Sequence, residues 1–232
     1  MPGPRGAADH RKPPLSVRFM DDEHLAFVVA EHRRCFPDGF FARLGPRFLT
    51  AYTRTYLTSP HAVGFVAELA GEPVGYLVGI VDPTLHRRHL LRTHGLRLAL
   101  QGAAGLLLRP GLAARFARTR LSRYYRKLRP GAPVPQSPAA HGVAAVSGRE
   151  AVLAHIAVVE PARGRGAGAE LIGKFMQFAT LAGCSGASLV TAAGPDGAGA
   201  YYAARGWQLR GQSYTPEQRP LLTYVRDLQP PA

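Results

Sequence analysis

The stretch PARGRGAGAEL, Pro161–Leu171, contains three glycines and two arginines within six consecutive positions, 163–168. It follows REAVLAHIAVV (149–159), an apolar run typical of a buried strand. It precedes GAELIGKFMQFATLAG (168–183), whose apolar residues recur on one helical face. A glycine-rich loop between a strand and a helix gathers backbone N–H groups at the positive end of the helix dipole. We therefore expect this loop to bind a phosphate group, rather than to act as a linker or a purely structural turn.

Two familiar phosphate-binding patterns fit this loop poorly. Gly168-x4-Gly173-Lys174 resembles a P-loop, but Phe175 occupies the position where a Ser or Thr must hold magnesium, and Gly173 falls inside the predicted helix. Gly164-x-Gly166-x-x-Ala169 fits the dinucleotide fingerprint, which needs an acidic residue at the end of the next strand. The corresponding segment, CSGASLVTAAG (184–194), has none. The P-loop interpretation fails and the dinucleotide interpretation is weak.

The rest of the chain shows the alternation of strands and helices of an α/β protein. Acidic residues in the first turn of 21–36 favour a helix start there, and the turn AGEP (70–73) between two β-rich runs predicts a hairpin over 61–82. The remaining predictions are a strand over 15–20, a helix over 42–59, a strand over 187–194, a short helix over 196–206 and a strand pair over 207–214 and 221–228.

Two motifs in this order resemble one known family. Arg163-x-x-Gly166-x-Gly168, between its strand and its helix, resembles the acetyl-CoA loop of the Gcn5-related N-acetyltransferase (GNAT) superfamily. Tyr202-Ala-Ala-Arg-Gly206-Trp207 resembles the Y-x-x-x-G-F motif of the same family. The resemblance covers residues 15–82 and 149–228. It implies a three-layer α/β fold, with helices on both faces of a mixed sheet of about seven strands.

The domain organisation follows from the same resemblance. Residues 1–14 are expected to form a disordered tail, and residues 15–230 a single GNAT-like domain interrupted by a basic helical insertion with a Pro-rich linker at 83–148. The insertion is the main departure from the family, whose typical members cross this point in a few residues. A smaller departure is Pro195-Asp196, where many members carry an Asn before the last helix.

The resemblance also implies a reaction: transfer of an acyl group, which is acetyl by family default, from acyl-CoA to a primary amine by direct attack in a ternary complex. Acetyl-CoA would be the acyl-donor substrate, and no metal is implied. By analogy, strand residues Ile156, Ala157 and Val158 would bind pantetheine, and the Val158 amide would polarise the thioester carbonyl. The pyrophosphate would lie on the backbone of Arg163, Gly164, Arg165, Gly166, Ala167 and Gly168.

The two proton-transfer roles rest on different signals. Tyr202 aligns with the family tyrosine that protonates the CoA thiolate, although a core tyrosine is the structural alternative. His155, on the cofactor strand, is the candidate base because its ordinary pKa suits proton transfer near neutral pH. Glu68, Asp82, Glu150 and a water chain are the alternatives to His155.

The net charge of +14 belongs almost wholly to the insertion. Residues 83–148 contain 12 arginines and lysines and no Asp or Glu, which leaves +2 for the other 166 residues. The insertion could form one wall of a site for an anionic acceptor, lie on an acidic membrane surface, bind nucleic acid, contact a second copy in a homodimer, or cap the sheet. The alternative to an enzyme is a catalytically weak acyl-CoA-binding module whose insertion contacts nucleic acid or a membrane.

The composition argues against a disulfide scaffold, a zinc site, a membrane span and a secretion signal. The only cysteines are Cys35 and Cys184, no Cys/His cluster has zinc-ligand spacing, and no uncharged apolar run reaches the roughly 20 residues needed to span a bilayer. The first residues lack the apolar core of a secretion signal. We expect a cytoplasmic protein whose partner is a small-molecule or peptide amine.

Overall fold

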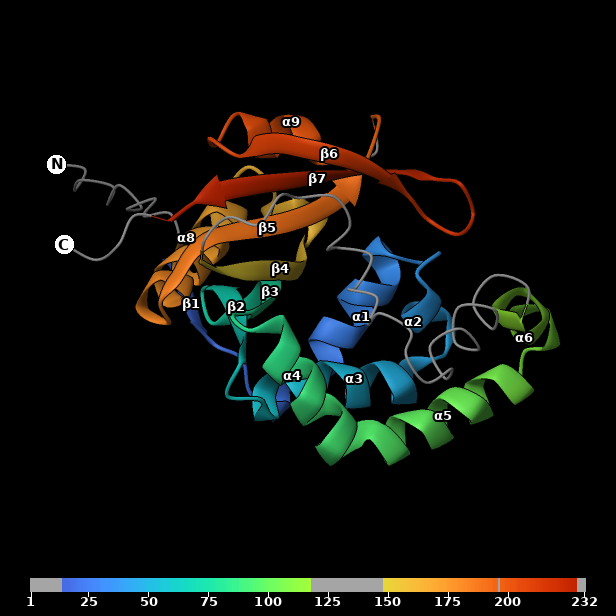
Figure 1. The fold of residues 1–232 in the computed structure, drawn as a ribbon. Helices are drawn as coiled ribbons and strands as arrows, with labels where there is room; N and C mark the ends of the chain where they lie inside the picture. The colour runs from blue at the N-terminus through green and yellow to red at the C-terminus, as the bar shows by residue number, and fades with distance from the viewer. Residues whose placement is uncertain (1–13, 118–147, 196, 229–232) are drawn as a thin grey trace, which may run out of the picture.

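The computed structural model describes residues 14–117, 148–195 and 197–228, which build a seven-stranded mixed sheet flanked by helices (Figure 1). The strand order is β1-β2-β3-β4-β5-β7-β6. This architecture confirms the predicted fold class. The strands are β1 Leu15–Phe19, β2 Ala62–Leu69, β3 Glu72–Ile80, β4 Arg149–Val158, β5 Cys184–Ala192, β6 Gln208–Tyr214 and β7 Pro220–Asp227.

Helices cover both faces of the sheet. Helices α1 and α3 pack on one face, where Val28, Val66 and Tyr76 are almost fully buried. Helix α8 packs on the other face, where Leu171 and Phe175 meet the sheet. The bounds are α1 Leu25–Cys35, α2 Phe40–Arg43, α3 Pro46–Thr58, α8 Ala167–Leu181 and α9 Gly199–Ala203, with a 3-10 turn at Asp22–His24 before α1.

Glycines fix two close approaches in this framework. Gly71, at φ +84°, closes the tight β2–β3 turn together with Ala70, at φ +55°. The ring of Phe175 lies over Gly79 on β3 so closely that a Cβ at Gly79 would overlap it. Helix α8 therefore packs directly on β3. This contact fixes the distance between the first turn of α8 and the end of β4.

The pairing between β4 and β5 is parallel and short. It runs from Arg149 opposite Cys184 to Leu153 opposite Leu189, while all other neighbouring strands pair antiparallel. Beyond Leu153, β4 continues to pair with β3 alone. The two central strands therefore separate toward the end of the sheet that carries the glycine-rich loop.

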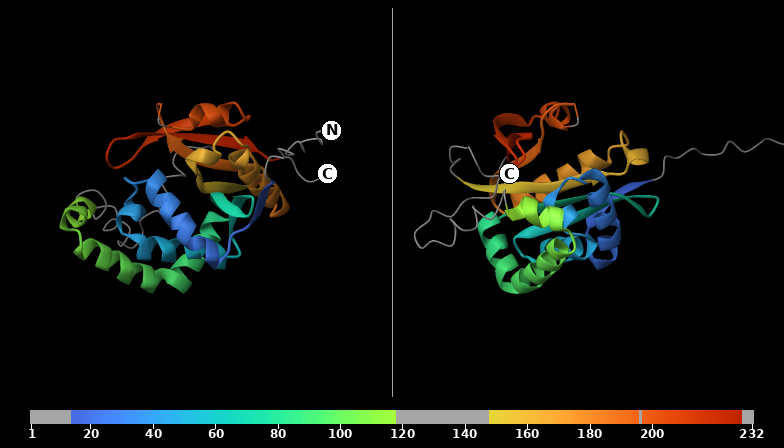
Figure 2. Two further views of the ribbon diagram at one scale, coloured as in Figure 1. Left: turned by 180° about the vertical axis from the view of Figure 1, so that it is seen from behind. Right: turned by 90° about the vertical axis from the view of Figure 1, so that its right-hand side faces the viewer.

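The described part of the insertion forms an arc of helices along the outer side of α3 (Figures 1 and 2). Its inner face contacts α2 and α3 through Leu98 and Gly105, where a Cβ on Gly105 would lie 2.6 Å from the Leu44 carbonyl oxygen. The described helices of the insertion therefore do not form a cap on the sheet, which was one of the alternatives, because α1 and α3 already cover that face. The elements are α4 Pro83–His89, a π-helical turn Leu90–His94, α5 Gly95–Leu107 and α6 Pro110–Phe116.

Residues 1–13 and 118–147 lie outside the described residues, and they hold most of the expected tail and the later part of the expected helical insertion with its Pro-rich linker. Of the described helices, none combines the length and the apolar character needed to cross a membrane.

Candidate active site

The separation of β4 from β5 leaves one edge of β4 open beside the glycine-rich loop. The amide of Val159 donates to the Val74 carbonyl on β3 over 2.8 Å. Because successive strand amides point to opposite sides, the Val158 and Ile156 amides point away from β3, toward the opening. The Ala157 amide points to β3, where Ala157 pairs with Tyr76. Of the three residues predicted to bind pantetheine, two thus offer amide donors to the opening and the third does not.

The loop itself is an open backbone turn at the start of α8. Gly164 and Gly166 have φ values of +75° and +92°, and Gly166 is the N-cap of α8. Among the described residues, none outside the immediate chain neighbours lies within 4 Å of where a Gly164 Cβ would be. The first amides of α8 have no intrahelical acceptor and lie at the positive end of the dipole. These features fit a phosphate-bearing ligand such as the pyrophosphate of CoA.

Two of the six amides predicted to hold the pyrophosphate are already used. Arg163 N–H donates to the Glu160 carbonyl at 3.1 Å, and Arg165 N–H to the Ala162 carbonyl at 3.4 Å. The Arg163 side chain also turns back, because its Nε donates to the Val158 carbonyl at 3.3 Å. The candidate donors are therefore the amides of Gly164, Gly166, Ala167 and Gly168, with Arg165 exposed at the rim.

Two tyrosines of α9 lie on the α8 side of the sheet. Tyr202 is buried against Trp207 and Tyr224, and desolvation raises the pKa of its phenol to about 12. Tyr201 is half-buried, and its hydroxyl lies 3.1 Å from the position that a Cβ on Gly168 would take. The Y-x-x-x-G-F motif pointed to Tyr202, and no motif pointed to Tyr201, because its proximity to Gly168 depends on how α9 packs.

The start of α9 is anchored to β5 without the family asparagine. The Ala198 amide donates to Thr191 Oγ1 at 3.1 Å, which ties the loop before α9 to the end of β5. Asp196, one of the two residues in the asparagine region, lies outside the described residues. A threonine of β5 thus supplies an anchor for the helix that carries Tyr202.

Comparisons with known proteins agree with this geometry. The model of the acetyltransferase (GNAT) family matches residues 122–207, a span that includes both the glycine-rich loop and the Tyr202–Trp207 motif. Over these residues the chain is similar to the GNAT family. No curated protein gives a significant match.

Solved structures share the fold at low sequence identity. Ard1 from Thermoplasma volcanium is 14% identical, with a TM-score of 0.54 over 93% of this chain and 98% of that one. An N-acetyltransferase from Staphylococcus aureus Mu50 is 14% identical, with a TM-score of 0.54 over 93% and 99%. The ribosomal-protein-S18-alanine N-acetyltransferase from Escherichia coli is 12% identical, with a TM-score of 0.50 over 94% and 97%.

His155 lies on the face of β4 that packs against α1. Its ring meets His32 edge-on at 4.7 Å between centroids, and Phe36 lies 5.9 Å away. Burial, followed by the neighbouring His32, lowers the pKa of His155 to about 3. Burial also lowers the pKa of His32 to about 4, and His32 Nδ1 lies 3.0 Å from the Tyr76 hydroxyl. Both imidazoles are therefore neutral at physiological pH.

The three carboxylates considered as alternatives to His155 lie away from the opening between β4 and β5. Glu68 pairs with Arg18 and His24 at the β1–β2 end of the sheet. Asp82 caps α4 by accepting a hydrogen bond from the Leu85 amide at 2.9 Å. Glu150 lies in the closed part of the β4–β5 ladder, opposite Gly186. The structure gives each a position that does not bring it to the open edge of β4.

An arginine-lined cavity of about 500 Å³ lies beyond the end of α1. It joins residues far apart in the sequence, since Arg33 and Arg43 flank the α1–α2 segment while Arg109 comes from the insertion. The guanidinium of Arg109 donates to the Leu44 carbonyl at 3.3 Å. The lining residues are Arg33, Pro37, Ala42, Arg43, Arg109, Gly111 and Leu112.

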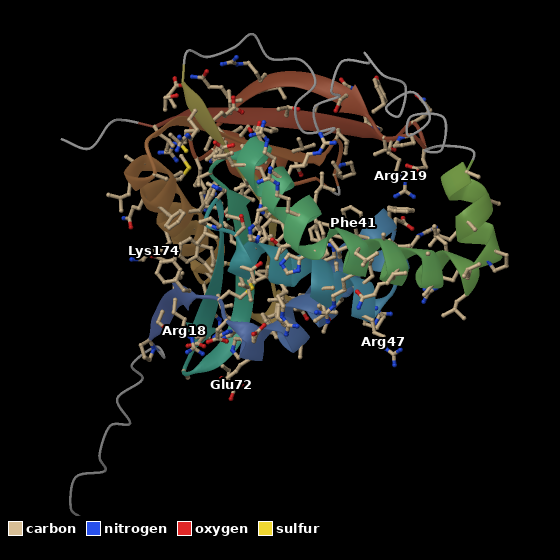
Figure 3. All side chains as sticks on the ribbon, turned by 60° about the horizontal axis from the view of Figure 1, so that its bottom comes forward. Arg18, Phe41, Arg47, Glu72, Lys174 and Arg219 are labelled. Atoms are coloured by element: carbon tan, nitrogen blue, oxygen red, sulfur yellow. The ribbon has the colours of Figure 1, made fainter. Side chains whose placement is uncertain are left out.

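An ion-pair bridge joins this region to the β6–β7 hairpin. Asp38 accepts from Arg43 at 2.7 Å and from Arg219 at 2.8 Å, and both partners hold the pKa of its carboxyl below the ordinary value. Figure 3 shows Arg219 extending toward the region of Phe41 on α2. Sequence reasoning could not find this arrangement, because its members are separated by up to 181 positions.

Proposed function

We propose that this GNAT domain is an acetyl-CoA-dependent N-acetyltransferase acting on a primary amine by direct attack in a ternary complex. The supporting observation is the continuity of the open β4 edge with the loop at the start of α8. One contiguous surface thereby offers strand amides at Ile156 and Val158 and the loop amides of Gly164, Gly166, Ala167 and Gly168. An acyl thioester carried on a pantetheine arm with a pyrophosphate needs donors in this order.

Strand β4 activates the thioester, which is the electrophile of the reaction. The Val158 amide, pointing into the opening, would donate to the thioester carbonyl oxygen as negative charge develops there. A backbone donor held in a β-ladder needs no reorganisation during the reaction, since β3 fixes the strand on its other side. The amine nitrogen would attack the thioester carbon from the side of the opening that α1 and α2 border.

The proton for the departing thiolate is assigned to Tyr202. With its pKa raised to about 12, its phenol stays protonated across the neutral range and retains a proton to donate. His155 was the candidate general base, but we assign it a positioning role instead, because its pKa is lowered to about 3. A neutral imidazole with a pKa of about 3 can accept a hydrogen bond from the amine and orient it, while the ammonium proton leaves through water.

The acceptor is proposed to be an amine that carries a carboxylate or phosphate. The arginine-lined cavity adjoins His32 and Phe36 in sequence through Arg33 and Pro37, and these two rings contact His155 on β4. Arginine guanidinium groups match the planar, bidentate geometry of such anions. The acidic group would sit among Arg33, Arg43 and Arg109, with the amine directed to the opening.

Thermal melting with CoA, acetyl-CoA and NAD tests the assignment first. A ligand at 100 times its Kd should add about 2.7 kcal/mol to the free energy of unfolding and raise Tm by a few degrees. We expect CoA and acetyl-CoA to stabilise the protein and NAD to leave it unchanged. Equal melting temperatures with and without CoA would overturn the proposal.

An amine screen, with release of free thiol as the signal, then addresses the acceptor. We expect amines with a carboxylate or phosphate to react faster than their uncharged analogues. Binding of CoA without turnover on any amine would favour the acyl-CoA-binding module instead of the enzyme.

Replacing Tyr202 by Phe should lower kcat by about 100-fold, while KM for acetyl-CoA changes little, because general acids contribute at least that factor. Tyr201→Phe is the matched control, since it removes the neighbouring phenol near Gly168. Steady-state kinetics of both variants separate the two roles. A loss of kcat in Tyr201→Phe but not in Tyr202→Phe would move the acid to Tyr201.

A further inference from the structure

The outer side of the insertion arc is a solvent-exposed leucine surface. Leu96, Leu100 and Leu107, spaced four and seven residues apart on α5, keep 77%, 64% and 83% of their side-chain exposure. At the two ends of α5, Leu91 in the π-helical turn and Leu108 at the C-cap are also exposed, at 58% and 81%. We call these five leucines the leucine face. Soluble proteins rarely expose a contiguous apolar strip on one helix unless the strip contacts another surface.

The leucine face exists in addition to an inner apolar face. Leu98 and Gly105 already pack α5 on α2 and α3, so the outer leucines contribute nothing to holding the insertion on the domain. Figures 1 and 2 show α5 along an outer side of the molecule, with α3 between it and the sheet. A flat surface could therefore reach the leucine face without meeting the opening between β4 and β5.

The charges beside the leucine face are all positive. Arg87, Arg88, Arg92 and Arg97 are exposed on or before the first turns of α5, and residues 83–148 contain no Asp or Glu. Two-fold pairing of this face with a second copy would bring arginines together without an acidic partner from either insertion. A partner surface with an apolar interior and a negatively charged exterior could bury the leucines and pair with the arginines at the same time.

We propose that the leucine face docks the protein on an anionic lipid bilayer, with α5 lying in the plane of the interface. The leucines would enter the boundary between headgroups and acyl chains, and the arginines would bind lipid phosphates around them. This is peripheral attachment and not a membrane span. It would place the acetyltransferase at the surface of a membrane, whichever amine it uses.

Vesicle flotation of the full chain tests this proposal, using phosphatidylcholine vesicles with and without about 30% phosphatidylglycerol. We expect binding to the anionic vesicles, weakening with added salt, and little binding to the neutral ones. The variant L96Q/L100Q/L107Q should bind the anionic vesicles at least about tenfold more weakly, because binding scales with buried apolar area. Its matched control is L181Q/L209Q, which changes two exposed leucines on α8 and β6 at 81% and 58% exposure.

Both variants are first checked for a wild-type melting temperature, which the exposure of the changed leucines predicts. Absence of binding by the wild type would overturn the proposal. So would a triple variant that binds like the wild type, since the arginines beyond residue 117 would then suffice. A triple variant that turns a dimer into a monomer in light scattering, with no vesicle binding by either protein, would assign the leucine face to a second copy.

Discussion

Gly166→Val should weaken acetyl-CoA binding by about 1,000-fold. Gly166 is the N-cap of α8 at φ +92°, a backbone conformation that a β-branched residue cannot adopt without strain. The loop would have to change course, and the amides of Gly164 to Gly168 would no longer converge on one point. Losing two charge-assisted hydrogen bonds to a pyrophosphate costs about 4 kcal/mol, which corresponds to that loss of affinity.

The control for this variant lies at the other end of the same helix. Gly183 follows α8 at φ +78°, and no other part of the chain lies within 4 Å of its Cβ position. Gly183→Val therefore imposes comparable backbone strain on α8 without touching the loop. Titration calorimetry with acetyl-CoA, well below the melting temperatures, should give near wild-type affinity for Gly183→Val alone. Equal affinities for the two variants would mean that the loop does not bind the pyrophosphate.

Acidification from pH 7 to 5 should remove about 6 kcal/mol from the free energy of unfolding, about 2 kcal/mol for each of three buried histidines. Burial lowers the pKa of His32 and His86 to about 4 and the pKa of His155 to about 3. In the unfolded chain all three return to about 6.5, so below that pH the unfolded state binds protons that the folded state does not. Stability is thus fully present above pH 6.5 and falls as pH approaches 4. Each histidine costs about 2 kcal/mol by pH 5.

Urea unfolding at a series of pH values measures this loss, and His86→Phe isolates one third of it. The ring of His86 packs against Tyr56 at 5.1 Å, and its Nδ1 has no hydrogen-bond partner among the described residues, so phenylalanine keeps the packing. We expect this variant to retain about two thirds of the pH dependence. A variant with the wild-type slope would show that His86 titrates normally in the folded protein.

The parts of the fold that the sequence predicted well carry local signals. The glycine-rich loop lies between an apolar run and an amphipathic run, and the β2–β3 turn has Gly71 at its tip. The separation of β4 from β5 carries no such signal, because it depends on where the register of two strands ends. The family resemblance predicted pantetheine binding by Ile156, Ala157 and Val158, and the structure shows which of their amides face the opening.

The side-chain arrangement of the site was predicted less completely. Tyr201 and Tyr202 are adjacent in sequence, and only the packing of α9 decides which phenol lies near Gly168 and which enters the core. His155 was chosen for its ordinary pKa, yet contact with His32 on α1 and loss of water change that property. The arginine-lined cavity requires α1, α2 and the insertion to meet, which no periodicity along the chain expresses.

The insertion leaves and rejoins the sheet between two strands that are already neighbours. Ile80, the last residue of β3, pairs with Val152 near the start of β4, so the ends that the insertion must connect lie side by side. Closing a loop that is four doublings longer costs only about 2.4 kcal/mol in chain entropy. The β3–β4 connection can therefore be exchanged. A segment of another length and surface could replace residues 83–148 while the sheet kept its register. Grafting residues 83–148 into a GNAT domain with a short β3–β4 connection would show whether membrane location and acceptor preference are transferred with the insertion.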